Sequence, residues 1–249
     1  MKTSDNTILI TGGGSGIGRA LAESFHARGN RVIIAGRRPA VLDAVTRAHP
    51  GMASLVLDIE DANAIRDFAA RLLKEHPALN IVVHNAGIMR AEDLPSAPDY
   101  LATAEATVAT NLLGPIRLTA ALLPHLLQQP TATIMTVTSG LAFVPKAGFP
   151  TYCATKAALH SYTESLRHQL KDTKVEVLEL APPYVQTELI GAFQASDPHA
   201  MPLKAFIDES LQLLSATPTP AEILVEPVKP LRFAAQGDYA GFFKTLNDA

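Results

Sequence analysis

The sequence predicts a single doubly wound α/β domain, with a parallel sheet of six or seven strands flanked by helices. Short β-favouring runs alternate with helical patterns along most of the 249 residues, which is the order of successive βαβ units. A Gly-rich turn at residues 12–18 joins the first such run to the first helical pattern. Ser139 follows a later run, and an open α/β sheet places its ligand crevice at the carboxyl ends of its strands.

The composition fits a soluble globular protein that can bury a full core, with 47% hydrophobic and 18% charged residues. The net charge is −3 and the pI about 6.2, so we expect no nucleic-acid partner. Pro115, Arg117, Pro124 and His125 interrupt the longest apolar runs, and none reaches the roughly 20 residues of a membrane span. We therefore expect no membrane partner.

The cellular compartment and metal content are predicted from a few residues. The stretch Met1–Thr7 is short and polar, unlike a signal peptide. Cys153 is the only cysteine, which excludes an internal disulfide. His160 and His168 share a predicted helix without the spacing of a metal site. We expect a cytoplasmic protein without a bound metal.

The first unit is a β-favouring run at 7–11, a glycine turn and a helical pattern. Glycines permit a tight turn and close backbone approach, and the following helix N-terminus faces a pyrophosphate. A tight turn without a ligand is the alternative. The residues predicted to bind a dinucleotide here are Gly12, Gly14, Ser15, Gly16, Ile17 and Gly18.

The second strand, 31–35, ends in Gly36, Arg37 and Arg38. An acidic residue there would bond the ribose 2′-hydroxyl of NAD, whereas guanidinium groups pair well with a phosphate. We therefore predict NADP (NADPH), with Arg37 preferred over Arg38 as the phosphate ligand. Alternatively, both arginines only open a solvated helix.

The next elements are a helix at 40–48, a strand at 54–57, a helix at 61–75 and a strand at 80–84. Asp61 is a plausible N-cap of the second of these helices. A long helix is then expected at 99–127, bent near Gly114-Pro115, because proline lacks the amide donor and clashes with the preceding turn.

Tyr152 and Lys156 lie four residues apart in a predicted helix that runs to about residue 171, so their side chains share one face. A phenol titrates near pH 10, and a cation within about 4 to 6 Å favours the phenolate. We expect Lys156 to lower the pKa of Tyr152, so that this residue exchanges a proton with a substrate oxygen. Chance spacing on a surface helix is the alternative. Ser139 ends the preceding strand, 132–138.

The last part of the chain begins with a strand at 174–180. Residues 188–219 are predicted to form a loop and short helices that cover a substrate, although ordinary core packing explains the pattern equally well. Thr219-Pro220-Ala221-Glu222 has the composition of a helix start. The stretch 239–246 is predicted to be helical, and no seventh strand is evident.

Over about residues 5–190, these motifs together resemble the short-chain dehydrogenase/reductase family, whose domain is of the Rossmann type. The resemblance implies an oxidoreductase that reduces a carbonyl, or oxidises a secondary alcohol, by hydride transfer. It assigns catalysis to Asn111, Ser139, Tyr152 and Lys156. In the family the matching asparagine holds a water that connects the lysine to solvent, whereas a surface or capping role for Asn111 is the alternative.

The resemblance also implies further cofactor contacts. Residues after the third and fourth strands would meet the adenine and the cofactor backbone, the turn after the sixth strand would shelter the nicotinamide, and the catalytic lysine would hold the ribose. The positions concerned are Asp58, Ile59, Asn85, Ala86, Gly87, Tyr152, Lys156, Pro182, Val185 and Thr187. Two residues depart from the family pattern: His84 stands where asparagine is common, and Pro183 where glycine is usual.

The family is usually dimeric or tetrameric, so we expect a homodimer or homotetramer acting on a small carbonyl or alcohol substrate. Two other functions remain open at this point. One is another NADP-linked reaction, such as imine reduction or epimerisation, because fold does not fix function. The other is an NADP-binding sensor or regulator without turnover.

Overall fold

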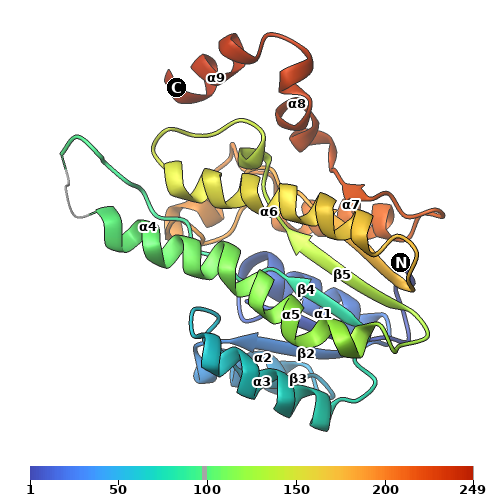
Figure 1. Cartoon of the computed structure of the whole chain (residues 1–249). Coiled ribbons are helices and arrows are strands. Elements are labelled where there is room, and N and C mark those ends of the chain that lie inside the picture. The colour runs from blue at the N-terminus through green and yellow to red at the C-terminus, as the bar shows by residue number, and fades with distance from the viewer. Residues whose placement is uncertain (97–99, 249) are drawn as a thin grey trace.

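A computed structural model describes residues 1–96 and 100–248 of the chain. Its centre is a parallel sheet in the order β3-β2-β1-β4-β5-β6-β7 (Figure 1), which confirms the predicted fold class. The strands are β1 Thr7–Thr11, β2 Arg31–Gly36, β3 Ala53–Val56, β4 Ile81–His84, β5 Ala132–Val137, β6 Val175–Leu180 and β7 Glu222–Ile223. The order reverses between β1 and β4, so a crevice opens there at the carboxyl edge.

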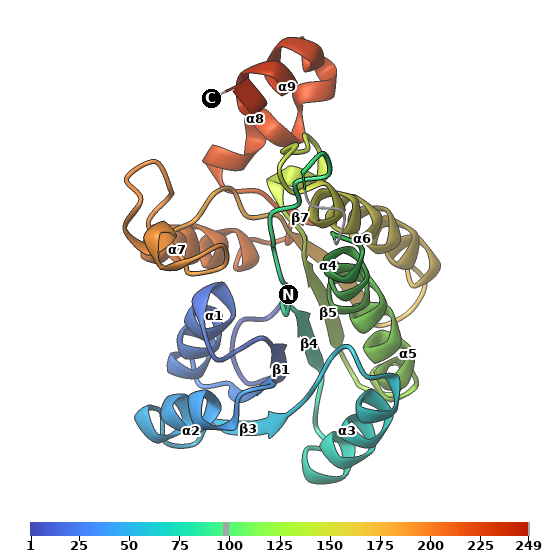
Figure 2. The ribbon, with the colours of Figure 1, turned by 90° about the vertical axis from the view of Figure 1, so that its left-hand side faces the viewer.

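Helices cover both faces of the sheet (Figure 2). On one face lie α1 Gly16–Ala27, α2 Pro39–Ala48 and α7 Leu203–Leu214, and on the other lie α3 Ala62–Glu75, α5 Gly114–Leu126 and α6 Pro150–Gln169. Ile8 and Ile10 pack with the first group and Leu9 with the second, because successive strand residues point to opposite faces. Burial on both sides explains why the strands are apolar throughout.

The helix start predicted at Thr219–Glu222 is wrong. Glu222 and Ile223 form β7, a seventh strand that the sequence did not reveal, in register with Glu179 and Leu180 of β6. Ile223 is fully buried, and the hydroxyl of Thr219 accepts a hydrogen bond from the amino group of Met1. Pairing with β6 and burial override the local helix-start signal.

The long helix is interrupted rather than simply bent. It comprises α4 Tyr100–Val108, a π-helical segment Ala109–Leu113, and α5; Asp99, the predicted first residue, lies outside the described residues. Pro115 stands at the start of α5, where a missing amide is tolerated. The π segment absorbs the change in backbone hydrogen bonding.

By length and composition, Tyr100–Leu126 qualifies as a membrane-spanning helix, with a mean hydropathy of 1.3. This corrects the expectation that its prolines and charges keep the apolar run too short. Leu118, Leu122 and Leu126 pack in the core together with α3, and a buried core helix has the same composition. The helix is therefore weak evidence for a membrane.

The C-terminal segment extends beyond the carboxyl edge of the sheet, at the top of Figure 1. It consists of short helical turns, Glu226–Val228 and Ala234–Gln236, around α8 Lys229–Arg232, followed by α9 Tyr239–Asp248. The predicted helix at 239–246 is thus confirmed. A further short turn, Ala192–Ser196, precedes α7.

Candidate active site

The glycine turn joins the end of β1 to the start of α1. Gly12 and Gly16 have φ of 69° and 51°, values that favour glycine. The amides of Gly12 and Gly13 donate to the carbonyl of Ala35, at 2.7 and 3.3 Å. A Cβ added at Gly16 would lie 3.5 Å from Thr187 Cγ2. The turn and Thr187 therefore lie next to each other at the N-terminus of α1, and the amides of a helix N-terminus favour a phosphate.

Thr11, which was not among the predicted site residues, fixes the neighbouring turn. Its hydroxyl accepts hydrogen bonds from the amides of Asn85 and Ala86, each at 3.1 Å. The Asn85 side chain in turn donates to the Thr11 carbonyl at 3.0 Å. These bonds lock the carboxyl ends of β1 and β4 side by side. A threonine that ends a strand before a glycine turn is the sequence signal that would have found it.

The two predicted phosphate ligands follow β2. Arg38 precedes α2 and is exposed, while Arg37 is half-exposed and pairs with Glu60 at 3.1 Å. Oε1 of Glu60 also accepts the hydroxyl of Thr110 at 2.8 Å. Arg37 is therefore held near the predicted adenine end of the site by a carboxylate that also contacts the π segment.

Asp58 and Ile59, the predicted adenine contacts, have different environments. Asp58 is exposed, and its carboxylate accepts the amide of Glu60 at 3.1 Å. Ile59 is buried and belongs to the core cluster that includes α3 and α5. The Ile59 side chain is thus occupied in packing, and Asp58 is the more accessible of the two.

Tyr152 and Lys156 lie in the first two turns of α6, and both are buried. The ammonium of Lys156 donates to the carbonyl of Val137 at 2.8 Å and lies 5.6 Å from the centre of the Tyr152 ring. Ser139 follows the end of β5, and its hydroxyl accepts the amide of Leu141 at 3.1 Å. Because Ser139 also hydrogen-bonds Tyr152, the structure brings three of the four predicted catalytic side chains together.

The electrostatics of this group differ from the expectation. Burial raises the pKa of Tyr152 to about 12, and a hydrogen bond with Ser139 acts in the opposite direction. Burial also lowers the pKa of Lys156 to about 8. The prediction that Lys156 lowers the pKa of Tyr152 is therefore wrong for this arrangement, because removal from water disfavours the charged form of each group.

Asn111 lies within the π segment and is completely buried. Its side-chain oxygen accepts the amide of Ile88 at 2.9 Å, and its nitrogen donates to the carbonyl of Ile88 at 2.9 Å and to Thr155 at 3.3 Å. The hydroxyl of Thr155 donates to the carbonyl of Tyr152 at 2.7 Å. A Cβ added at Gly87 would lie 3.3 Å from Asn111 Oδ1 and 3.6 Å from Lys156 Nζ. Asn111 is thus not a surface residue, and Thr155, which sequence reasoning missed, joins it to α6.

The turn at 182–187 closes the site beside Ser139. The carbonyl of Pro182 accepts the amide of Gly140 at 2.8 Å. Val185 is buried and forms an isolated parallel bridge with Met201. None of the described residues 182–187 has a positive φ, which is compatible with Pro183 at the position of the usual glycine.

His84 is a packing residue next to this site. It is buried, its Nε2 lies 2.9 Å from the hydroxyl of Thr119, and burial lowers its pKa to about 4. The ring is therefore neutral near pH 7. Among residues 1–96 and 100–248, no group of three or more His, Cys, Asp or Glu is arranged to hold a metal ion.

Comparisons with known proteins agree with this geometry. The short chain dehydrogenase profile matches residues 6–197. The uncharacterized oxidoreductase DltE of Bacillus subtilis (strain 168) is 40% identical and covers 99% of this chain and 98% of its own.

Two solved structures extend the likeness to the fold. A short-chain dehydrogenase from Streptomyces avermitilis is 26% identical, with a TM-score of 0.83 over 98% of this chain and 96% of its own. A short-chain dehydrogenase from Sphingobium yanoikuyae, in complex with NADPH, is 25% identical, with a TM-score of 0.79 over 96% of this chain and 95% of its own.

Proposed function

The chain belongs to the short-chain dehydrogenase/reductase family and is an oxidoreductase of that type, and we propose that it is an NADPH-dependent carbonyl reductase. In the opposite direction the same site would oxidise a secondary alcohol. The observation that carries the proposal is the convergence of Ser139, Tyr152 and Lys156 beside Gly87 and Asn111. Ser139 follows β5 and Gly87 follows β4, so the group lies at the carboxyl edge of the sheet, where the strand order reverses between β1 and β4.

The nicotinamide, when bound, supplies the hydride, and the protein supplies position and proton transfer. Tyr152 donates a proton to the carbonyl oxygen as that oxygen gains negative charge. Ser139 hydrogen-bonds the same oxygen and orients it. The burial that raises the pKa of Tyr152 keeps the phenol protonated, so it acts as the acid in the reductive direction.

After Tyr152 has given up its proton, Lys156 and Asn111 form the path by which another proton reaches it. Lys156 is held by the Val137 carbonyl, and its pKa of about 8 lies close to neutrality, where an ammonium exchanges protons readily. We propose that Lys156 also holds the ribose of the cofactor. Asn111 holds a relay water next to this ammonium, through the second lone pair of an oxygen that already binds the amide of Ile88.

The proposed preference for NADPH rests on Arg37 and Arg38 at the end of β2. A 2′-phosphate would pair with one or both guanidinium groups, and the NADPH complex of the Sphingobium protein supports this choice. The remaining cofactor contacts are proposed at the glycine turn, Asp58, the Asn85–Gly87 turn and the turn at 182–187. Ile59 contributes through packing.

The substrate is proposed to be a mainly hydrophobic ketone, aldehyde or alcohol. Residues 188–219 would cover it, since Gln194 and Gln186 tie the segment to the 184–187 turn through bonds to Val185 and Asp197. We further propose a single domain that assembles as a homodimer or homotetramer in the cytoplasm.

Titration of the purified protein with NADPH and with NADH, followed by nicotinamide fluorescence, is the first test. A panel of ketones and aldehydes then reports turnover through the absorbance of the reduced nicotinamide. We expect tighter binding of NADPH and its oxidation by at least one carbonyl compound. Tight binding without turnover would favour a sensor or a different NADP-linked reaction, and binding of neither nucleotide would overturn the proposal.

A further inference from the structure

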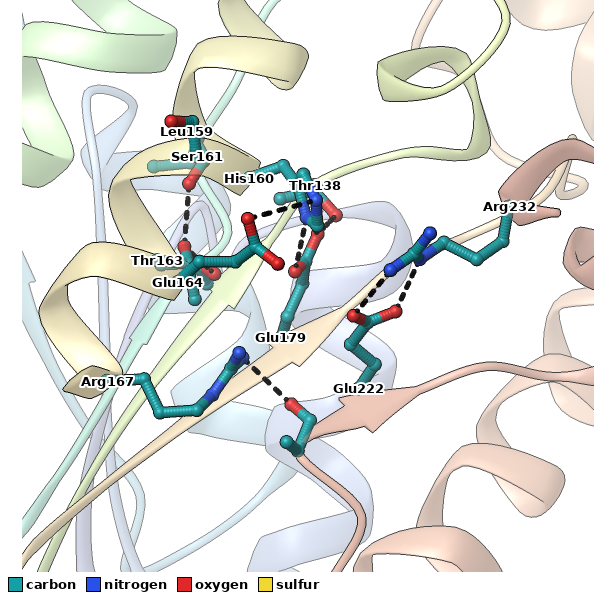
Figure 3. A network of polar contacts seen from close by, with 12 residues as sticks. Thr138, Leu159, His160, Ser161, Thr163, Glu164, Arg167, Glu179, Glu222 and Arg232 are labelled. Carbon is teal, nitrogen blue, oxygen red and sulfur yellow. Dashed lines mark hydrogen bonds and ion pairs between the residues drawn. The ribbon is translucent and has the colours of Figure 1, made fainter. Parts of the chain in front are cut away.

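A fully buried carboxylate lies directly behind the candidate active site. Glu179 of β6 has an exposed fraction of 0%. Its Oε1 accepts the hydroxyl of Thr138 at 2.6 Å, and its two oxygens lie 3.0 and 2.8 Å from Nδ1 of His160 (Figure 3). The function proposed above uses none of these three side chains.

Such a carboxylate is costly to bury unless it is paired and hydrogen-bonded. Here the carboxylate lies within hydrogen-bond distance of the His160 imidazole, and this hydrogen bond is the main cause that raises the pKa of His160. Thr138 adds a short hydrogen bond from a third element. The cluster is therefore a satisfied network whose members restrict one another in position.

The three partners come from the elements that carry the candidate site. Thr138 immediately precedes Ser139, and His160 lies one helical turn beyond Lys156 on the same face of α6. Glu179 sits in β6, between β5 and β7. One carboxylate thus joins the strand end that presents Ser139 to the helix that presents Tyr152.

We propose that Glu179, held by His160, is a positioning residue that sets the Ser139 hydroxyl relative to the Tyr152 phenol. This inference rests on the proposed function. The amide of Thr138 donates to the Leu180 carbonyl at 2.9 Å and its hydroxyl lies 3.5 Å from the same oxygen, so the bond to Glu179 is the short side-chain bond that ties Thr138 to the network joining β6 and α6. If that bond is lost, the Ser139 hydroxyl moves away from the position at which it and Tyr152 both hydrogen-bond the substrate oxygen. A misplacement of about 1 Å is enough to slow catalysis substantially.

Two further carboxylates, Glu222 and Glu164, lie near this cluster. Glu222 of β7 pairs with Arg232 of α8, at 2.6 and 2.9 Å, as Figure 3 shows beside the Glu179 cluster. Glu164, on α6 and 53% exposed, lies 3.7 Å from Nε2 of His160. Glu164 therefore approaches the same imidazole from its outer side and offers a matched control.

The test compares Glu179→Gln and Thr138→Val with the control Glu164→Gln. Glu179→Gln removes the charge at nearly constant shape and leaves a single acceptor oxygen for Thr138 and His160, whereas Thr138→Val removes only the hydroxyl donor. We expect each to lower kcat about 10- to 100-fold, with the Kd for NADPH within about twofold of wild type. Glu164→Gln should keep kcat within about twofold. A loss of thermal stability with unchanged kcat in the first two variants would overturn the proposal.

Crystal structures of the same variants separate this inference from the proposed function. We expect the Ser139 hydroxyl to be displaced relative to Tyr152 in Glu179→Gln and Thr138→Val, and unmoved in Glu164→Gln. That result supports the positioning role even if no carbonyl compound is turned over. An unmoved Ser139 in all three variants would overturn it, whatever the activity. If Glu179→Gln does not fold, Thr138→Val alone decides, because it leaves the pair of Glu179 and His160 in place.

Discussion

At the scale of single residues, the site balances burial against hydrogen bonding. Tyr152 is desolvated, which keeps its phenol neutral, while Ser139 supplies the one contact that favours ionisation. Lys156 is desolvated too, and the Val137 carbonyl takes one of its three donors. The two residues are therefore better described as a buried acid and a nearby proton source than as an ion pair.

Replacing Tyr152 with Phe removes the proton donor and leaves the ring volume in place. We expect kcat to fall by about 10²- to 10⁴-fold, because only the acid catalysis is lost. NADPH titration should give a Kd close to that of wild type. Turnover near the wild-type rate would assign the proton transfer to another group.

Arg37 offers a second prediction at this scale. Its ion pair with Glu60 is partly exposed and so worth about 0 to 1 kcal/mol. Glu60→Gln frees the guanidinium for a 2′-phosphate, and we expect NADPH to bind up to about fivefold more tightly while the affinity for NADH stays constant. Arg37→Asp should weaken NADPH far more than NADH. Equal effects on both nucleotides would move the phosphate site elsewhere.

At the scale of elements, the π segment Ala109–Leu113 sets the depth of Asn111. The following helix approaches the loop after β3 closely, since a Cβ added at Gly114 would lie 2.5 Å from Ile59 Cγ1 and 3.0 Å from the Ile59 carbonyl. The helix fits only because position 114 lacks a side chain. The placement of Asn111 thus depends on the close contact between Gly114 and Ile59.

Gly114→Ala should therefore disturb both stability and activity. Overpacking at such a contact costs about 1 to 3 kcal/mol, measurable by urea unfolding, and the displaced Asn111 should lower kcat. Gly148→Ala is the control, because an added Cβ there meets no described atom within 4 Å. Equal behaviour of the two variants would show that the helix shifts without consequence.

The buried pair joining β6 to α6 predicts a pH dependence of stability. Glu179, Glu164 and Glu222 all act to raise the pKa of His160 in the folded protein, and Arg232 lies beyond Glu222. The stabilisation is complete below the unfolded pKa of about 6.5 and is lost as pH rises through the higher folded pKa. Urea unfolding between pH 6 and 9 should show this decline, and Glu179→Gln should reduce it. An identical decline in that variant would assign the titration to another group.

At the scale of the whole molecule, the C-terminal segment folds back over the loop that follows Ser139. Arg232 lies over the Phe143 ring at 4.8 Å. The side chain of Asn247 donates to the Pro145 carbonyl at 3.1 Å and accepts the Ala147 amide at 2.5 Å. Residues far apart in the chain thus enclose the loop that leads into the Tyr152 helix.

Asn247→Ala removes both side-chain bonds to this loop. Because the loop connects Ser139 to the helix of Tyr152 and lies apart from the glycine turn in sequence, we expect a higher KM for the carbonyl substrate with little change in the Kd for NADPH. Hydrogen exchange of the amides at 141–149 should quicken in the same variant. Unchanged exchange would show that α9 does not restrain the loop.

The sequence by itself determined the features that depend on neighbouring residues. The glycine turn, the first six strands and the Tyr152 helix follow from local pattern. So does the N-cap at Asp61, whose carboxylate accepts the amides of Asn63 and Ala64. Local propensity and periodicity govern such elements, so a single stretch of chain contains the information.

Only the tertiary structure decided the features that depend on distant partners. β7 is two residues long and exists through pairing with β6. The raised pKa of Tyr152 follows from burial by several elements, and no spacing in the sequence marks Thr138 and His160 as partners of Glu179. Strand pairing, desolvation and buried ion pairs are properties of the packed chain, because each is set by what the fold brings within a few ångströms.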